Sequence, residues 1–253
     1  MKPNIIFIVI DSLRADKCHG EKKTSVTPNI DSLIENGTYF NQTITHGQST
    51  IPCMSSILTS LYPFESMSQN EDIFVINPKA ETYIENLEEF GYESHALVQE
   101  SLSHMGLDKI FRKNFEMYPV TLKTWTGLDK KIIQRIESFS KTDPWFYYIH
   151  LYDLYIPFNQ QDVKKVNNLD GLYPGDTTYD RMLSAIDVSI GKILENVDQE
   201  KTLVVITADH GHEKGAFTES MENIHQENRK VRKHEPGVGF KIGQKIAHKF
   251  PKS

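Results

Sequence analysis

Acidic and imidazole side chains follow two of the most apolar runs in the sequence. Asp11 comes directly after the run 5–10, and Asp209 and His210 come just after the run 203–207. Carboxylate oxygens combined with an imidazole nitrogen suit Mn²⁺, Zn²⁺ or Mg²⁺. Two buried carboxylates that meet at one place repel each other unless a cation lies between them. The pattern therefore predicts a divalent metal site, with Mn²⁺ or Mg²⁺ ahead of Zn²⁺ or Ca²⁺.

A hydroxyl stands at the start of a predicted helix, at Thr50. The apolar residues after it recur at helical spacing: Ile51, Met54, Leu58 and Leu61. This spacing predicts a helix with Thr50 as its N-cap and Pro52 in the first turn. The positive end of a helix stabilises an anion or a nucleophilic oxygen. By itself the stretch is better explained as an ordinary capped core helix, because Thr caps are common, so the rest of the chain decides between the two interpretations.

Alternating strands and helices position these residues. Apolar runs predict strands over 5–10, 94–98, 145–151 and 203–207. Capping residues and helical periodicity predict helices over 27–37, from Thr50 onward, and over 80–90, 123–141 and 180–197. The alternation indicates a doubly wound α/β sheet with helices on both faces. Ligands of such sheets gather beyond the carboxyl ends of the strands, and the third run brings His150 and Asp153 to the same edge.

Composition and charge place the chain among ordinary globular proteins. It has 253 residues, 38% of them hydrophobic, and a formal charge of −6. Residues 229–253 carry eight Lys or Arg and one acid, which predicts a basic, solvated tail able to contact acidic surfaces. We expect no specific nucleic-acid binding. Two cysteines, Cys18 and Cys53, predict no disulfide framework, and the lack of a signal peptide or membrane span predicts a cytoplasmic location.

Five short blocks of residues occur in one order along the chain: 4–16, 27–31, 49–63, 150–153 and 207–211. Together they resemble the sulfatase branch of the alkaline phosphatase-like superfamily. The resemblance implies an alkaline phosphatase-like three-layer sandwich with a mostly parallel central sheet flanked by helices. It also implies a catalytic domain over 1–213, followed by a basic, loop-rich tail over 214–253 that is the remnant of a shortened C-terminal part.

The same resemblance assigns roles to four residues. Asp11, Asp209 and His210 match metal ligands, and Thr50 matches a nucleophile that itself sits on the metal. Sulfatases proper use a Cys or Ser that is oxidised to formylglycine, which Thr cannot form. Cys53 is no substitute, because the Pro and Arg expected two and four residues later are absent. Thr nucleophiles belong to the phosphodiesterase, phosphonate hydrolase and phosphoglycerol transferase branches.

Other positions depart from the family pattern. Ser12 stands where sulfatases have a second aspartate, and Tyr155 stands where a His is expected after Asp153. Asp153 and Tyr155 are predicted to contact the substrate. His150 and His212 are the candidate proton carriers, although for His150 a hydrogen-bonded structural role is favoured. A further His of the family could be His212, His225 or His234.

These observations predict a metal-dependent enzyme that hydrolyses or transfers phosphate esters or diesters through Thr50. The substrate would be a small-molecule, glycan or lipid phosphate or sulfate ester. One alternative is a sulfuric ester hydrolase that acts without formylglycine. A second alternative is a truncated, non-catalytic homologue that keeps a pocket for a metal or an anion.

Overall fold

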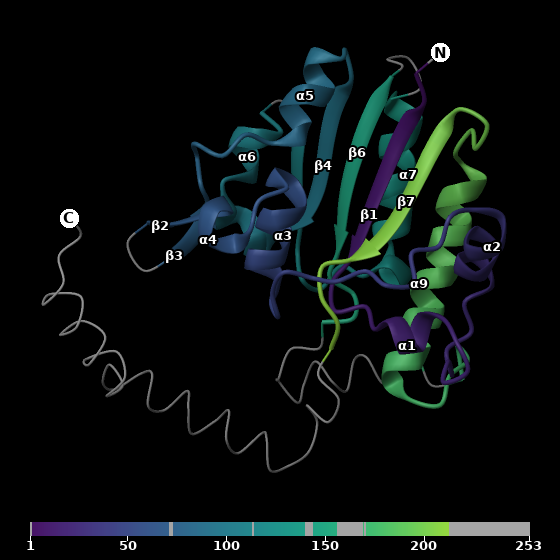
Figure 1. Cartoon of the computed structure of the whole chain (residues 1–253). Coiled ribbons are helices and arrows are strands. Elements are labelled where there is room, and N and C mark those ends of the chain that lie inside the picture. The colour runs from purple at the N-terminus through teal and green to yellow at the C-terminus, as the bar shows by residue number, and fades with distance from the viewer. Residues whose placement is uncertain are drawn as a thin grey trace, which may run out of the picture. The chain divides into compact units, whose positions relative to one another are not determined.

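A five-stranded sheet in the order β5-β4-β6-β1-β7 forms the centre of the fold (Figure 1). Its strands are β1 (Asn4–Ile10), β4 (Glu93–Gln99), β5 (Phe115–Tyr118), β6 (Trp145–Leu151) and β7 (Thr202–Ala208). Every neighbouring pair is parallel. The computed structural model describes residues 2–70, 73–112, 114–139, 144–155, 169 and 171–212. All of these lie in one compact unit, Met1–His212.

The register of the central strands aligns their carboxyl ends. Ile10 pairs with Leu151 of β6 on one side and with Ala208 of β7 on the other. Because the three strands run in parallel and end level, the residues that follow them leave the sheet at one edge. The parallel arrangement of these strands agrees with their sequences, because continuous apolar runs favour strands buried within a parallel sheet.

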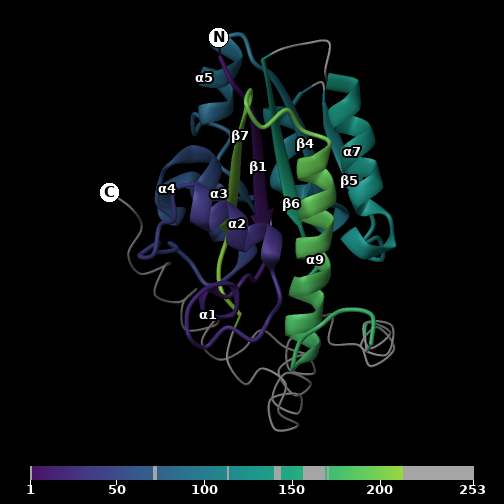
Figure 2. The same ribbon diagram turned by 90° about the vertical axis from the view of Figure 1, so that its right-hand side faces the viewer.

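Helices cover both faces of the sheet (Figure 2). One face carries α7 (Leu128–Phe139) and α9 (Thr178–Glu195), and the other carries α3 (Thr50–Thr59) and α5 (Tyr83–Glu89). Ile6, Ile8 and Ile10 of β1 belong to the core shared with α7 and α9. Val9 belongs to the core shared with α3 and α5. The predicted three-layer sandwich with a parallel central sheet flanked by helices is confirmed.

Smaller elements complete the described part of the chain. They are α1 (Ala15–Cys18), α2 (Pro28–Asn36), α4 (Pro63–Ser66), α6 (Leu107–Ile110), the 3₁₀ turns Glu100–Met105 and Thr124–Thr126, and the antiparallel pair β2 (Met67–Asn70) and β3 (Ile73–Ile76). The start of α2 is fixed by Asp187 of α9, whose carboxylate accepts hydrogen bonds from the backbone N–H groups of Asn29 and Ile30. This contact joins the loop after β1 to the helix that packs beneath it.

Two helix boundaries differ from prediction. Helix α3 begins at Thr50 itself, and Ser49 occupies the N-cap position with extended backbone angles. The prediction that Thr50 is the cap was therefore wrong. The helix expected over 123–141 is divided at Gly127, whose φ of +121° lies outside the helical region. The predicted tail, 214–253, lies outside the described residues, as do His225 and His234.

No helix in the described ranges is long and apolar enough to cross a membrane.

Candidate functional site

The carboxyl ends of β1 and β7 and the first turn of α3 meet at one place. There, ligand atoms of Asp11, Asp209 and His210 all lie within 4.8 Å of one another. Both carboxylates are almost completely buried, whereas the His210 side chain is 12% exposed. The structure therefore brings together the three residues that were predicted as metal ligands, although the sequence separates the first from the others by about 200 positions.

The Asp209 carboxylate is held by two backbone donors. Its Oδ1 accepts hydrogen bonds from the backbone N–H groups of Ser12 at 3.1 Å and His210 at 2.8 Å. Burial, followed by the nearby charge of Asp11, raises the pKa of Asp209 to about 7. Two buried carboxylates in such proximity require either a proton on one of them or positive charge between them. The raised pKa shows that the negative charges of Asp11 and Asp209 repel each other in this site.

His210 presents one ring nitrogen to this pair. Its Nδ1 lies 2.8 Å from the carbonyl oxygen of Gly211, a contact in which Nδ1–H is the donor. In that tautomer Nε2 carries a lone pair, and it lies 3.4 Å from Asp209 Oδ2 and 4.0 Å from Asp11 Oδ2. A carbonyl that fixes the tautomer of an imidazole is the usual support of a metal-ligating histidine.

The Thr50 hydroxyl points into the same cluster. Its Oγ1 donates a hydrogen bond to Asp11 Oδ2 at 2.8 Å and lies 3.4 Å from His210 Nε2. No capping hydrogen bond is made by the side chain at the start of α3. The hydroxyl is thus directed by the Asp11 carboxylate, which explains why the residue is not the helix cap that its position suggested.

Ser12 has a role that the sequence did not reveal. Its φ of 61° places a non-glycine residue in the left-handed region, which costs energy for an L-amino acid. This conformation directs its N–H to Asp209, while its Oγ donates to Asp11 Oδ1 at 2.7 Å. One residue therefore fixes both carboxylates. The sequence showed Ser12 merely as the replacement for a family aspartate.

The loop before α3 is tied to the site through Thr45, which sequence analysis also missed. Thr45 Oγ1 donates a hydrogen bond to the carbonyl oxygen of Asp209 at 2.6 Å and lies 3.1 Å from Cys53 Sγ. Burial raises the pKa of the Cys53 thiol, so that the sulfur stays protonated at neutral pH. Cys53 accordingly has the surroundings of a core residue rather than of a nucleophile.

His150 lies beneath the cluster at the end of β6. Its side chain is completely buried, and burial lowers its pKa to about 4. Nε2 is 3.8 Å from Asp209 Oδ2, and Nδ1 is 3.3 Å from the hydroxyl of Tyr148. A neutral, fully enclosed ring is poorly suited to exchange protons with solvent. These surroundings do not support the predicted use of His150 as a proton carrier. The residue does lie beside Asp209, one of the predicted metal ligands.

The segment after β6 contains the two predicted substrate contacts. Asp153 is buried, and its Oδ1 accepts hydrogen bonds from the N–H and hydroxyl of Thr124 at 2.6 and 3.0 Å, which supports the turn before α7. Tyr155 is 36% exposed and packs against Tyr152 with ring centroids 5.0 Å apart. Tyr152, which was not predicted, lies beside the cluster: burial, followed by the nearby charge of Asp11, raises the pKa of its hydroxyl, and a hydrogen bond with Thr50 opposes this rise. A contact of Asp153 or Tyr155 with substrate stays a prediction.

His212 lies against the first turn of α9. Its ring stacks on Tyr179 with centroids 6.2 Å apart and planes 23° apart. The Tyr179 hydroxyl donates to the Ser12 carbonyl at 2.9 Å and accepts from the Arg14 N–H at 2.8 Å. His212 thus contacts Tyr179, which is hydrogen-bonded to the turn that follows Asp11. The role of His212 as a proton carrier stays a prediction.

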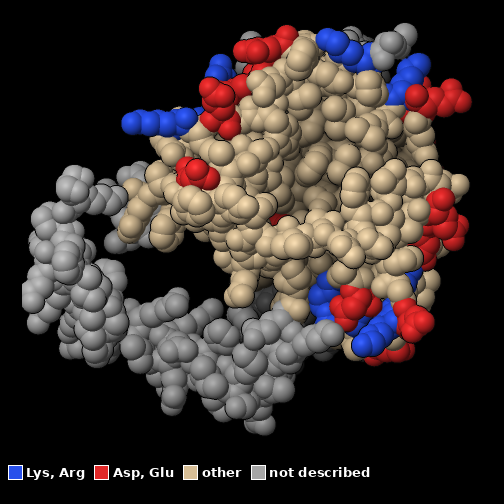
Figure 3. Space-filling view, in the orientation of Figure 1, with Lys and Arg blue, Asp and Glu red and all other residues tan. Residues whose placement is uncertain are grey.

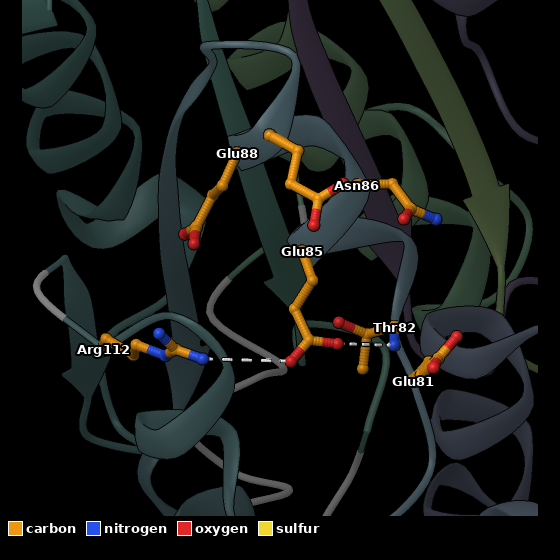
Figure 4. Close-up of a pocket in the computed structure, with 7 residues that line it drawn as sticks. Glu81, Thr82, Glu85, Asn86, Glu88 and Arg112 are labelled. Carbon is orange, nitrogen blue, oxygen red and sulfur yellow. Dashed lines mark hydrogen bonds and ion pairs between the residues drawn. The ribbon is translucent and has the colours of Figure 1, made fainter.

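The surface and the cavities of the described residues give further context. In the orientation of Figure 1 the uncharged surface is hollowed over the middle of the molecule, and charged side chains gather at its rim (Figure 3). A separate cavity of about 540 Å³ lies at α5, where Figure 4 shows the Glu85 carboxylate between Thr82 and Arg112. Four glutamates line this cavity: Glu81, Glu85, Glu88 and Glu89. Its negative charge makes it unsuited to an anionic ester.

The donor set at the strand ends fits a divalent cation. Asp209 Oδ2 is buried and has no hydrogen-bond partner among the described residues, so an electron pair of a charged oxygen is available to a ligand. Two carboxylates, one imidazole and one hydroxyl are hard and borderline donors, which suit Mn²⁺, Mg²⁺ or Zn²⁺ better than a soft ion. Asp11, Asp209, His210 and Thr50 are therefore chemically suited to hold a divalent cation of this kind.

The fold is that of an alkaline phosphatase-like α/β protein. Among solved structures, Ps i-CgsB is similar with a TM-score of 0.67 and 21% identity, over 83% of this chain and 58% of that one. The phosphonate monoester hydrolase of Agrobacterium radiobacter has a TM-score of 0.61 and 14% identity, over 86% of this chain and 66% of that one. The C-terminal periplasmic domain of EcEptC from Escherichia coli, in complex with Zn, has a TM-score of 0.59 and 15% identity, over 87% of this chain and 66% of that one.

The family model described as Sulfatase matches residues 3–240, and the chain belongs to the sulfatase family. Enzymes of this family and of the alkaline phosphatase-like fold are metal-dependent hydrolases and transferases. An uncharacterized protein of Haemophilus influenzae is 27% identical over 217 residues, which are 83% of this chain and 32% of that protein. An N-acetylgalactosamine-6-O-sulfatase of Bacteroides thetaiotaomicron is 31% identical over 97 residues, 36% and 19% of the two chains. The chain thus spans about a third or less of these curated relatives.

Proposed function

We propose that the chain cleaves or transfers phosphate esters, with a divalent cation held by Asp11, Asp209 and His210. Thr50 is the attacking residue. One observation carries the proposal: Thr50 Oγ1 lies 2.8 Å from Asp11 Oδ2 and 3.4 Å from His210 Nε2. A hydroxyl placed among metal-type donors is the arrangement that a metal-activated nucleophile requires.

Phosphorus is favoured over sulfur by the identity of the nucleophile. A threonine has a methyl group on Cβ and cannot be converted to the aldehyde that sulfatases proper use. The hydroxyl of Thr50 must therefore attack directly, which suits a phosphoryl group well. A structural neighbour that is a phosphonate monoester hydrolase is consistent with this choice.

The chain's own residues would orient and activate the hydroxyl. A bound divalent cation would supply the positive charge that stabilises an ionised Thr50 and the phosphoryl oxygens. Asp11 accepts the hydrogen bond of Thr50 and fixes the position of Oγ1. As the hydroxyl proton of Thr50 passes to the Asp11 carboxylate, the Oγ1–P bond forms and the bond from phosphorus to the leaving oxygen breaks; the leaving oxygen takes up a proton from His212, the proposed proton carrier. Water or another acceptor alcohol then attacks phosphorus and releases Thr50.

The test is the hydrolysis of bis-p-nitrophenyl phosphate by the full chain with added Mn²⁺. We expect Thr50→Ala to abolish the activity, because the attacking oxygen is removed, and Thr50→Ser to retain part of it. Thr43→Ala, at an exposed threonine of the preceding loop, is the matched control and should act like the unmodified chain. Full activity in Thr50→Ala would overturn the proposed nucleophile.

A sulfuric ester hydrolase is the second candidate, favoured by the sequence similarity to a relative that is an N-acetylgalactosamine-6-O-sulfatase. Parallel assays with p-nitrophenyl sulfate separate the two, because turnover of the sulfate ester alone would overturn the choice of phosphorus. The substrate would be a small-molecule, glycan or lipid ester, with Tyr155 and Asp153 on the substrate side and His212 as the proton carrier. Absence of turnover with any ester and any metal would favour a non-catalytic metal- or anion-binding protein.

A further inference from the structure

Tyr152 is the first residue after β6, at the edge of the sheet where the metal-type cluster lies. Leu151, the last residue of β6, pairs with Ile10, the last residue of β1. The Leu151 carbonyl oxygen accepts a hydrogen bond from the backbone N–H of Asp11 at 2.9 Å. Asp11 and Tyr152 therefore leave the sheet side by side, each directly after its strand. The Tyr152 side chain is only partly buried, so it lies beside the cluster without being enclosed.

Contacts of the backbone and of the ring hold Tyr152 in place. Its backbone N–H donates to the hydroxyl of Tyr118 at 3.0 Å, and its carbonyl oxygen accepts a hydrogen bond from Lys123 Nζ at 2.8 Å. Its ring packs against the rings of His150 and Tyr155, with centroids 6.2 and 5.0 Å away. The phenol is therefore fixed before any ester binds, which is what electrostatic preorganisation requires of a catalytic group.

The hydrogen bond between Tyr152 and Thr50 has a defined direction. A hydroxyl group has one proton to donate and two lone pairs with which to accept. Thr50 Oγ1 donates its proton to Asp11 Oδ2 at 2.8 Å, so Thr50 is the acceptor and Tyr152 the donor. The phenol keeps its proton at neutral pH, because burial and then the nearby charge of Asp11 raise its pKa. The attacking oxygen thus has one acceptor and one donor among its neighbours.

We infer that Tyr152 is a further catalytic residue, whose hydroxyl donates to Thr50 Oγ1 and stabilises the negative charge of this oxygen as it attacks the ester. The inference rests on the proposed function. In the resting site the acceptor is a neutral hydroxyl. Once the proton of Thr50 has passed to Asp11, the acceptor is a charged oxygen, and hydrogen bonds to charged acceptors are roughly twice as strong as neutral ones. The phenol retains its own proton throughout, so this hydrogen bond strengthens without a proton transfer.

This role predicts which kinetic parameter depends on the phenol. An interaction that strengthens only in the transition state raises kcat, whereas one that is made equally with the bound substrate lowers KM. The Tyr152 hydroxyl acts on the attacking oxygen and not on the ester. Its removal should therefore lower kcat and leave KM nearly unchanged.

The test is the hydrolysis of bis-p-nitrophenyl phosphate with added Mn²⁺ by the full chain and by Tyr152→Phe, which lacks only the hydroxyl. We expect kcat to fall at least about tenfold and KM to stay within about twofold. Tyr62→Phe is the matched control, at an exposed tyrosine that packs through its ring against His46 and Phe64. It should change neither parameter. An unchanged kcat in Tyr152→Phe, or a raised KM alone, would overturn the inference and leave the proposed function intact.

A second readout does not depend on turnover. Orthovanadate imitates the transition state of phosphoryl transfer, and its binding can be measured by calorimetry. We expect Tyr152→Phe to bind orthovanadate about tenfold more weakly than the unmodified chain, and equal affinity would overturn the inference. An unmodified chain that neither cleaves the ester nor binds orthovanadate would overturn both the inference and the proposed function.

If Tyr152→Phe fails to fold, a crystal structure of the unmodified chain with orthovanadate decides. A Tyr152 hydroxyl within about 3.2 Å of Thr50 Oγ1, the range of a hydrogen bond, supports the inference. A separation of more than about 4 Å overturns it.

Discussion

The hydroxyl of Tyr179 donates a hydrogen bond to the carbonyl oxygen of Ser12, 167 positions earlier in the chain, at a distance of 2.9 Å. The same hydroxyl accepts the N–H of Arg14 at 2.8 Å. The first turn of α9 therefore closes the turn that follows β1. Since Ser12 fixes both carboxylates of the site, a single phenol on the opposite side of the turn supports the ligand geometry.

Tyr179→Phe should disturb activity more than stability. The substitution keeps the ring but leaves the Ser12 carbonyl and the Arg14 N–H without this partner, which costs about 1–3 kcal/mol of unfolding free energy. We expect kcat with bis-p-nitrophenyl phosphate to fall about tenfold or more. Urea denaturation measures the first effect and steady-state kinetics the second. A variant with unchanged kcat would show that the turn keeps its shape without the phenol.

Ser12 allows backbone strain and hydrogen bonding to be separated. Ser12→Ala removes the hydrogen bond to Asp11 and keeps the left-handed strain, whereas Ser12→Gly removes both. Glycine adopts this region without penalty, so Ser12→Gly should be more stable than Ser12→Ala by about 1–2 kcal/mol. Denaturant midpoints provide the comparison. Equal stability of the two variants would contradict a strained turn.

Asp209→Asn should stabilise the metal-free protein and weaken metal binding. The pKa of Asp209 is raised from 3.8 to about 7 by burial and by Asp11. The folded state thus binds more protons than the unfolded state between these values, and stability falls as pH rises through that range. At pH 8 the metal-free variant should melt a few degrees above the unmodified chain, at roughly 2–4 °C per kcal/mol. At pH 4 the two should melt alike.

The same variant should lose most of the rise in melting temperature that Mn²⁺ or Zn²⁺ gives the unmodified chain, because it has lost a charged ligand. Thermal scans with and without metal at pH 8 measure both effects. A full metal-induced rise in Asp209→Asn would remove Asp209 from the set of ligands.

Cys53→Ala tests whether any cysteine chemistry contributes. The raised pKa of the Cys53 thiol keeps it protonated at neutral pH. Its contact is with Thr45, so the substitution should cost about 1 kcal/mol or less in stability and leave kcat within about twofold. Ester hydrolysis by Cys53→Ala and Thr50→Ala side by side is the measurement. Activity lost in Cys53→Ala and kept in Thr50→Ala would reverse the assignment of the nucleophile.

The buried histidine His95 should make the stability of the protein depend on pH. Its ring stacks on Phe139 at 3.8 Å between centroids, and burial lowers its pKa to about 4 despite Glu93 Oε1 at 3.4 Å. The unfolded state therefore takes up the proton first, and stability is lost as pH falls from about 6.5 toward 4. His95→Phe should flatten this loss, and His104→Gln, at an exposed histidine, should not. Chemical denaturation at several pH values checks the slope.

The sequence was sufficient to predict the metal-type cluster because its parts have local signals. Asp11 and Asp209 each end a continuous apolar strand, and strands of that kind lie parallel with their ends at one edge. The helix after Thr50 was also evident from its apolar spacing. Thr50 was wrongly assigned as its N-cap, because its hydroxyl donates a hydrogen bond to the Asp11 carboxylate. This tertiary contact cannot be predicted from the local sequence.

Other parts of the fold and site were beyond sequence reasoning for physical reasons. The strand β5 has four residues of mixed character, Phe115–Tyr118, and β2 is polar, so neither has a clear period. The left-handed turn at Ser12 is imposed by partners at Asp209 and Tyr179, far away along the chain. Thr45 and Tyr152 were missed for the same reason, because they act through residues remote in sequence.

The pairing of β1 with β7 joins the beginning of the described chain to its end, and this has a consequence for biosynthesis. At roughly 5–20 residues per second, about 10–40 seconds separate the synthesis of the two strands on a ribosome. During this interval β1 lacks one of its two neighbours, and Asp11 lacks its partners Asp209 and His210. Assembly of the cluster of Asp11, Asp209 and His210 is therefore a late event in maturation, and a nascent chain that stalls before β7 lacks the cluster.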